Sequence, residues 1–134
     1  MNIAKQLAKY GLIVVVTGMV FSCRKKEPTT PEPTITIDIQ STVEGAVYQR
    51  GDTVQVKALV SSPVEVHGYR WTITKANGTV LHSSSDHVHG RDFAINGVYV
   101  NMVDTSTAAT LQITVEVDHD GNQQQKSVSF MLQQ

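Results

Sequence analysis

The sequence has very little cysteine, few aromatic residues and no long hydrophobic run. Cys23 is the only cysteine, so a folded domain in this chain must be held together by core packing and not by an internal disulfide. The longest apolar run, Gly11 to Phe21, has about half of the roughly 20 residues that a membrane-spanning helix needs. Aromatic residues make up 6% of the chain, which disfavours a binding face built from several coplanar rings.

Basic residues are also scarce in the second part of the chain. Thr34 to Gln134 contains 6 Lys and Arg against 10 Asp and Glu, a net charge of about −4 with neutral histidines. This balance excludes the basic patch with which proteins bind nucleic acid. The sequence also has no phosphate-binding glycine loop and no serine in a nucleophile-elbow pattern. It therefore predicts a protein that is not an enzyme and does not bind nucleic acid.

The beginning of the sequence has the layout of an export signal followed by a spacer. Lys5 and Lys9 precede the apolar run, and the small residue Ser22 follows it directly before Cys23. A positive start, an apolar run and a small residue are the three parts of a secretory signal. Three of the four prolines lie between Glu27 and Pro33, and a segment so rich in proline is typical of an extended, semi-rigid spacer.

The segment that ends at Cys23 resembles bacterial lipoprotein signals, in which the cysteine is acylated and becomes the mature N-terminus. Ser22 and Cys23 match the pattern, whereas Val20 and Phe21 stand where Leu and then Ala or Ser are usual. The resemblance implies that Cys23 carries acyl chains such as palmitate, and two or more chains anchor a protein stably in a membrane. Because Arg24 and not aspartate follows the cysteine, it also implies the outer membrane, on its periplasmic or its outer face. The predicted organisation is a signal peptide at 1–22, a lipidated cysteine with a proline-rich linker at 23–33, and one domain at 34–134.

Apolar and polar residues alternate throughout Thr34 to Gln134, and this period of two predicts strands and no helix. Val64 to Lys75 is predicted as a long strand with Tyr69, Trp71 and Ile73 facing inward, and Asn77-Gly78 is predicted as the hairpin turn after it. Six or seven short strands in about 100 residues predict a two-sheet antiparallel β-sandwich. The other predicted strands are Thr34 to Gln40, Thr53 to Ser61, Thr79 to His82, Gly97 to Asp104, Ala109 to Asp118 and Lys126 to Leu132. Their predicted inward residues are Ile35, Ile37, Ile39, Val54, Val56, Ala58, Val60, Leu111, Ile113, Val115, Val117, Val128, Phe130 and Leu132.

Three stretches of the domain carry a resemblance to immunoglobulin-like domains of bacterial surface and periplasmic proteins. They are Gly51-Asp52-Thr53-Val54, Tyr69-Arg70-Trp71, and Val115-Glu116-Val117-Asp118 followed by Gly121-Asn122. The whole chain resembles small bacterial lipoproteins with one uncharacterised immunoglobulin-like domain and a His-x-His segment. The resemblance implies an all-β, immunoglobulin-like sandwich of about seven strands that serves as a binding or structural module, and it carries no activity with it.

Histidines are concentrated near the middle of the chain, where three of the five lie between Leu81 and Gly90. In an extended segment, His87 and His89 project to the same side, and imidazole with carboxylate suits Zn²⁺, Cu²⁺ or Ni²⁺. The composition of residues 82–96 is equally that of a solvated loop with exposed histidines. The candidate metal ligands are His82, Asp86, His87 and His89, with His67 and His119 as more distant contributors.

The sequence leaves three interpretations of function open. The first is a membrane-anchored binding or structural module of unspecified role. The second is a metal-binding protein that uses the histidine segment, which predicts stabilisation of the fold by metal. The third is an accessory module that binds a glycan or a protein of the cell envelope, which predicts an exposed aromatic or apolar patch on one sheet.

Overall fold

The computed structural model describes residues 34–134, so the predicted signal peptide, Cys23 and the proline-rich linker lie outside the described residues. The regular elements of the described residues are all strands, which confirms the all-β prediction, and these residues include no helix that could cross a membrane. The strands are β1 (Thr36–Ile39), β2 (Val47–Tyr48), β3 (Thr53–Lys75), β4 (Val80–Val100), β5 (Thr107–Glu116) and β6 (Gln123–Leu132).

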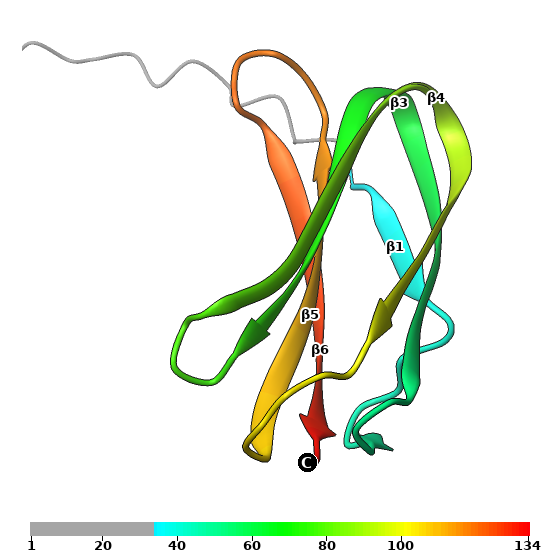
Figure 1. The fold of residues 1–134 in the computed structure, drawn as a ribbon. Helices are drawn as coiled ribbons and strands as arrows, with labels where there is room; N and C mark the ends of the chain where they lie inside the picture. Colours follow the sequence, from blue (N-terminus) through cyan, green and yellow to red (C-terminus); the bar gives the residue numbers. More distant parts are fainter. Residues whose placement is uncertain (1–33) are drawn as a thin grey trace, which may run out of the picture. The chain divides into compact units, whose positions relative to one another are not determined.

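The strands join into one curled sheet whose two halves lie face to face as the layers of a sandwich (Figure 1). The first half of β3 pairs with β1 and with the second half of β4, so that Val60 lies opposite both Ile37 and Phe93. The second half of β3 pairs with the first half of β4 and with β5, which continues to β6 and β2. Strands β3 and β4 therefore pass through both layers, where the sequence predicts separate short strands.

The bend in β3 has a local cause in the sequence. The register between β3 and β4 shifts twice between Ser61 and Gly68. Pro63 lies in this stretch, and proline occurs at bulges because it has no N–H to donate to a ladder. The Ser62 hydroxyl is 2.6 Å from the Val64 carbonyl oxygen and 3.2 Å from the Val64 nitrogen. The bend carries the chain from one layer to the other at one end of the sandwich.

The core lies between the layers and is made by alternate residues of the strands. Most of the residues that the sequence predicts to face inward are buried there, although Ile39, Tyr69 and Val117 are only partly buried. Trp71 in one layer packs against Gly97 in the other, where a Cβ atom would lie 2.7 Å from Trp71 Cε2. The predicted core residues that are buried are Ile35, Ile37, Val54, Val56, Ala58, Val60, Trp71, Ile73, Leu111, Ile113, Val115, Val128, Phe130 and Leu132.

Two connections around β4 show how far the predicted boundaries hold. The hairpin turn is confirmed at Asn77-Gly78, where Gly78 has a φ of 87° and donates its N–H to the Lys75 carbonyl. The strand predicted as Gly97 to Asp104 ends at Val100. Asn101 is fully buried directly after it and donates from Nδ2 to the carbonyls of Tyr48 and Gln133.

Candidate functional site

Four of the five histidines meet at the end of the sandwich where β3 bends. His67 lies in the bend of β3, His87 and His89 lie in β4, and His119 lies in the turn between β5 and β6. The ring centroid of His67 is 4.4 Å from that of His119 and 5.4 Å from that of His89. His87 and His89 are 4.6 Å apart by ring centroid. Segments far apart in the sequence thus contribute to one histidine cluster, defined here as His67, His87, His89 and His119.

The cluster has close polar contacts as well as ring contacts. The Nε2 atoms of His87 and His89 are 3.0 Å apart. His89 Nδ1 lies 3.3 Å from Glu65 Oε1, and both side chains are more than half exposed. His67 Nδ1, in contrast, is buried and has no hydrogen-bond partner within the described part of the chain. Glu65, which sequence reasoning does not single out, is therefore the carboxylate beside the cluster, and its position in the bend is what brings it there.

The side chains of His82 and Asp86 lie on the other face of β4 from that of His87, although Asp86 Oδ1 accepts a hydrogen bond of 2.8 Å from the His87 backbone N–H. Between the pairs Gly68 with His87 and Ile73 with His82, the register of β3 and β4 is regular. Side chains alternate between the two faces of a strand, so His82 and Asp86 project to the face opposite to that of His87. His82 stacks on Trp71 with ring centroids 4.5 Å apart. Burial raises the pKa of Tyr69, and the charge of Asp86 raises it further.

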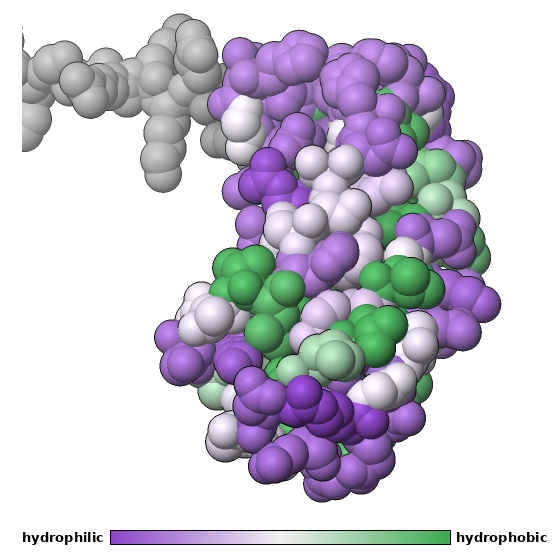
Figure 2. All heavy atoms as spheres, viewed as in Figure 1, coloured by the Kyte–Doolittle hydropathy of each residue, from purple (hydrophilic) through white to green (hydrophobic). Residues whose placement is uncertain are grey.

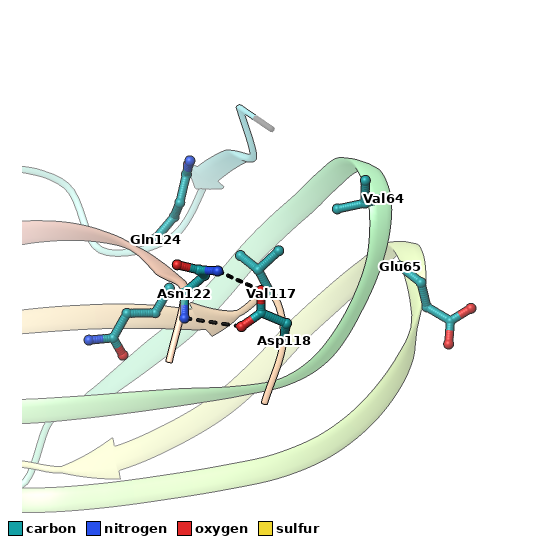
Figure 3. A pocket seen from close by; sticks show the side chains of 7 residues that line it. Val64, Glu65, Val117, Asp118, Asn122 and Gln124 are labelled. Carbon is teal, nitrogen blue, oxygen red and sulfur yellow. Dashed lines mark hydrogen bonds between the residues drawn. The ribbon is translucent and has the colours of Figure 1, made fainter. Parts of the chain in front are cut away.

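A hollow of about 300 Å³ adjoins the cluster at the same end of the domain. Figure 3 shows the side chains of Asp118 and Asn122 directed toward each other, and the Glu65 carboxylate directed away from the hollow. Hydrogen bonds from the Asn122 side chain and from the backbone N–H groups of Asn122 and Asp120 hold the pKa of Asp118 below its ordinary value, and the nearby His67 adds to this. The hollow is lined by Val64, Glu65, Val117, Asp118, Asn122, Gln123 and Gln124.

The residues of the cluster are close together without forming a finished metal site. Within residues 34–134, no three His, Cys, Asp or Glu side chains are positioned to hold a metal ion. The sequence-based ligand set of His82, Asp86, His87 and His89 stays a prediction, of which the structure brings together His87 and His89. What the arrangement offers chemically is four imidazoles at one end of the sandwich, with the Glu65 carboxylate beside His89 and the Asp118 carboxylate near His67.

A second feature of the surface is an apolar stripe on one face of the C-terminal end of β4 and of the residues directly after it. Val98, Val100 and Met102 follow each other at every second position and are 62%, 45% and 60% exposed. Figure 2 shows apolar side chains gathered over the C-terminal end of β4. Across residues 34–134, this half of β4 pairs with β3 alone, so its other edge has no neighbouring strand.

The chain matches no known protein-family model and no curated protein sequence. It is similar to solved structures. Fibronectin(III)-like modules of CbhA from Clostridium thermocellum are 21% identical, with a TM-score of 0.46 over 73% of this chain and 96% of that chain. A CARDB domain from Pyrococcus furiosus, solved in complex with di-metal ions, is 13% identical, with a TM-score of 0.44 over 76% and 96%. CopC from Methylosinus trichosporium is 8% identical, with a TM-score of 0.43 over 75% and 93%.

The arrangement of the strands decides the fold. One layer holds β1, the first half of β3 and the second half of β4, and the other holds the remaining halves of β3 and β4 with β5, β6 and β2. If each half of β3 and of β4 is counted as one strand, the domain has the seven strands of an antiparallel sandwich. The two-residue β2 is an additional short strand. The fold is immunoglobulin-like. Such domains carry many unrelated functions, so the function of this immunoglobulin-like domain has to be argued from its surfaces.

Proposed function

We propose that the chain is a lipid-anchored, non-enzymatic protein of the bacterial outer membrane whose immunoglobulin-like domain binds an extended segment of a partner protein. The anchor is supported by the sequence that leads to Cys23. The binding function is carried by one observation, which is the apolar stripe of Val98, Val100 and Met102 at the C-terminal end of β4, a strand whose outer edge there pairs with no other described strand.

The edge of β4 lacks the features that keep sheet edges from pairing. Charged residues, especially lysine, and proline usually prevent such edges from pairing. Phe93 to Met102 contains neither a charged residue nor a proline. An unprotected edge of this kind can pair with a strand from another chain.

A strand that binds by adding itself to an edge gains affinity from main-chain hydrogen bonds and specificity from hollows that take alternate side chains. A shallow hollow of about 370 Å³ lies beside the stripe and is lined by Gln55, Lys57, Asn96 and Val98 among others. The partner segment that fits this edge is therefore extended and uncharged, with apolar side chains at every second position.

The aromatic residues of the domain favour a protein partner over a glycan. A glycan platform needs exposed rings, but Trp71 and Phe130 are buried and Tyr48, Tyr69, Phe93 and Tyr99 pack against the core. The exposed patch is apolar and aliphatic, and backbone pairing does not depend on aromatic rings.

The binding face can be tested with a photo-crosslinking amino acid placed at Val100 in living cells, with the same amino acid at Ser127 in the other layer as the control. We expect a discrete adduct with one envelope protein from position 100 only, whose crosslinked peptide is an uncharged, apolar segment. The substitution Val98→Lys should abolish this adduct without lowering the urea midpoint of the domain. Equal adducts from both positions, no adduct, or an adduct with a second copy of this chain would contradict the proposed partner.

The anchor is tested separately. In cells supplied with an alkyne analogue of palmitate, the wild-type chain should be labelled and remain in the outer-membrane fraction. Cys23→Ala should be unlabelled and leave that fraction. Labelling that persists in Cys23→Ala would overturn the anchor without bearing on the β4 edge.

A further inference from the structure

The histidine cluster places four imidazole rings close together at a position that does not belong to the apolar core. His87, His89 and His119 are exposed, and the core is made of apolar residues elsewhere. The proposed protein-binding edge also does not use them, because the stripe lies at the C-terminal end of β4. Four imidazoles from three separate parts of the fold nevertheless converge at one end.

The nitrogen atoms of His87 and His89 are spaced for a shared ligand. Their Nε2 atoms are 3.0 Å apart. Zinc–imidazole bonds of about 2.0–2.1 Å would bridge that gap at an angle of roughly 95°, and a tetrahedral angle needs about 3.3 Å. The distance between the two Nε2 atoms is therefore within a few tenths of an ångström of that between two ligands of one metal ion, and rotation of the two exposed side chains would direct both nitrogens toward it.

His67 supplies a second, independent observation. Its Nδ1 atom is buried and lacks a hydrogen-bond partner among residues 34–134, and a buried polar atom left in this state is costly. The ring is in contact with those of His89 and His119. The fold holds the ring of His67 in place, so a metal ion bound by this ring would bind to the folded domain and stabilise it.

The charges around the cluster favour a cation. Glu65 lies 3.3 Å from His89, and Asp118 is close enough to His67 for the two to interact electrostatically. Imidazole with carboxylate, in the absence of thiolate, selects Zn²⁺ and Cu²⁺ over Ca²⁺ or Mg²⁺.

We infer that His67, His87, His89 and His119, with Glu65 beside them, form a binding site for one Zn²⁺ or Cu²⁺ ion. The described residues are not positioned to hold the ion as they stand. Binding therefore requires the exposed imidazoles to rotate toward it. This site differs from the ligand set predicted from the sequence. It excludes His82 and Asp86, and it includes residues from the bend of β3 and from the β5–β6 turn.

The test is calorimetric titration of the chain from Arg24 to Gln134 with Zn²⁺, Cu²⁺ and, as a control ion, Ca²⁺. We expect one Zn²⁺ or Cu²⁺ per chain, no binding of Ca²⁺, and affinity reduced by at least about tenfold in His67→Gln and in His87→Gln. His82→Gln and Asp86→Asn are the matched controls and should bind as the wild type does. Urea unfolding of each variant without metal shows whether it is folded before it is titrated.

Electron paramagnetic resonance of the Cu²⁺ complex gives a readout that does not depend on affinity. Coupling to imidazole nitrogen should be present in the wild type and in His82→Gln, and should be reduced in His67→Gln. Loss of binding in His82→Gln and Asp86→Asn, with His67→Gln unaffected, would overturn the site in favour of the neighbouring set. Absence of saturable one-to-one binding would overturn it altogether.

Discussion

At the scale of single residues, Gly97 lies against the Trp71 ring of the other layer and leaves no room for a side chain. A Cβ atom there would lie 2.7 Å from Trp71 Cε2 and 3.1 Å from Trp71 Nε1. Trp71 is buried and stacked on His82, so its ring cannot move aside freely. Gly97→Ala should therefore lower the free energy of unfolding by about 1–3 kcal/mol, the range for overpacked cores.

The matched control for this prediction is Gly90→Ala in the same strand. A Cβ atom at Gly90 would have its nearest neighbour, a Val88 methyl, at 4.0 Å. Urea unfolding followed by the fluorescence of the single tryptophan measures both variants. Equal stability of the two would show that the layers can separate enough to admit a methyl group.

At the scale of elements, the turn between β5 and β6 depends on one carboxylate. Asp118 accepts hydrogen bonds from the backbone N–H groups of Asp120 and Asn122 and from the side chain of Asn122. These contacts lower its pKa from 3.8. A carboxyl group whose pKa is lower in the folded state stabilises the fold above its unfolded pKa, and that contribution is lost as the pH falls through the folded value.

Asp118→Asn should therefore destabilise the domain near pH 6, and the difference from the wild type should shrink as the pH falls below 3.8. Urea unfolding of both proteins at several pH values measures this. A difference that is the same at pH 6 and at acidic pH would show that the loss does not come from the ionised carboxylate. Titration of the Asp118 carboxyl by NMR gives the direction of the pKa shift directly.

The sequence predicts elements well where one face of a strand is buried. In β5, Leu111, Ile113 and Val115 are fully buried at alternate positions, and the hydrophobic period shows it. In the first half of β4, no residue before Ile95 is buried. Its serines, histidines and aspartates are equally typical of a loop, so composition does not predict a strand here. The segment is a strand because it pairs with β3 over a long range.

The histidine cluster could be predicted only in part for a related reason. His87 and His89 share a face because they are two residues apart, and the structure agrees. His87 lies five positions after His82, an odd offset, so a regular strand places the two side chains on opposite faces, which the sequence could have shown. The approach of His67 and His119 depends on the bend of β3 and on the β3–β5 pairing, which no local pattern contains.

At the scale of the whole molecule, the two layers are joined by the same two strands. Both β3 and β4 run through each layer, and the core contacts across the layers include Trp71 against Gly97. Separating the layers would break the ladder at the bend and expose both apolar faces at once. Residues 34–134 contain no disulfide, so each layer depends on its own strand pairing and on the core that it shares with the other layer. We therefore expect the domain to unfold in one cooperative step.

Amide hydrogen exchange on the two sides of the β3 bend tests this expectation. Val56 lies before the bend and Ile73 after it, and both are fully buried. Under native conditions their amides should exchange with the same free energy of opening, equal to the global free energy of unfolding, because each layer exists only while the other does. A clearly lower value at Val56 would mean that the three-stranded layer opens by itself. It would also place the unpaired edge of β4, which lies in that layer, in a segment that can detach to receive a partner strand.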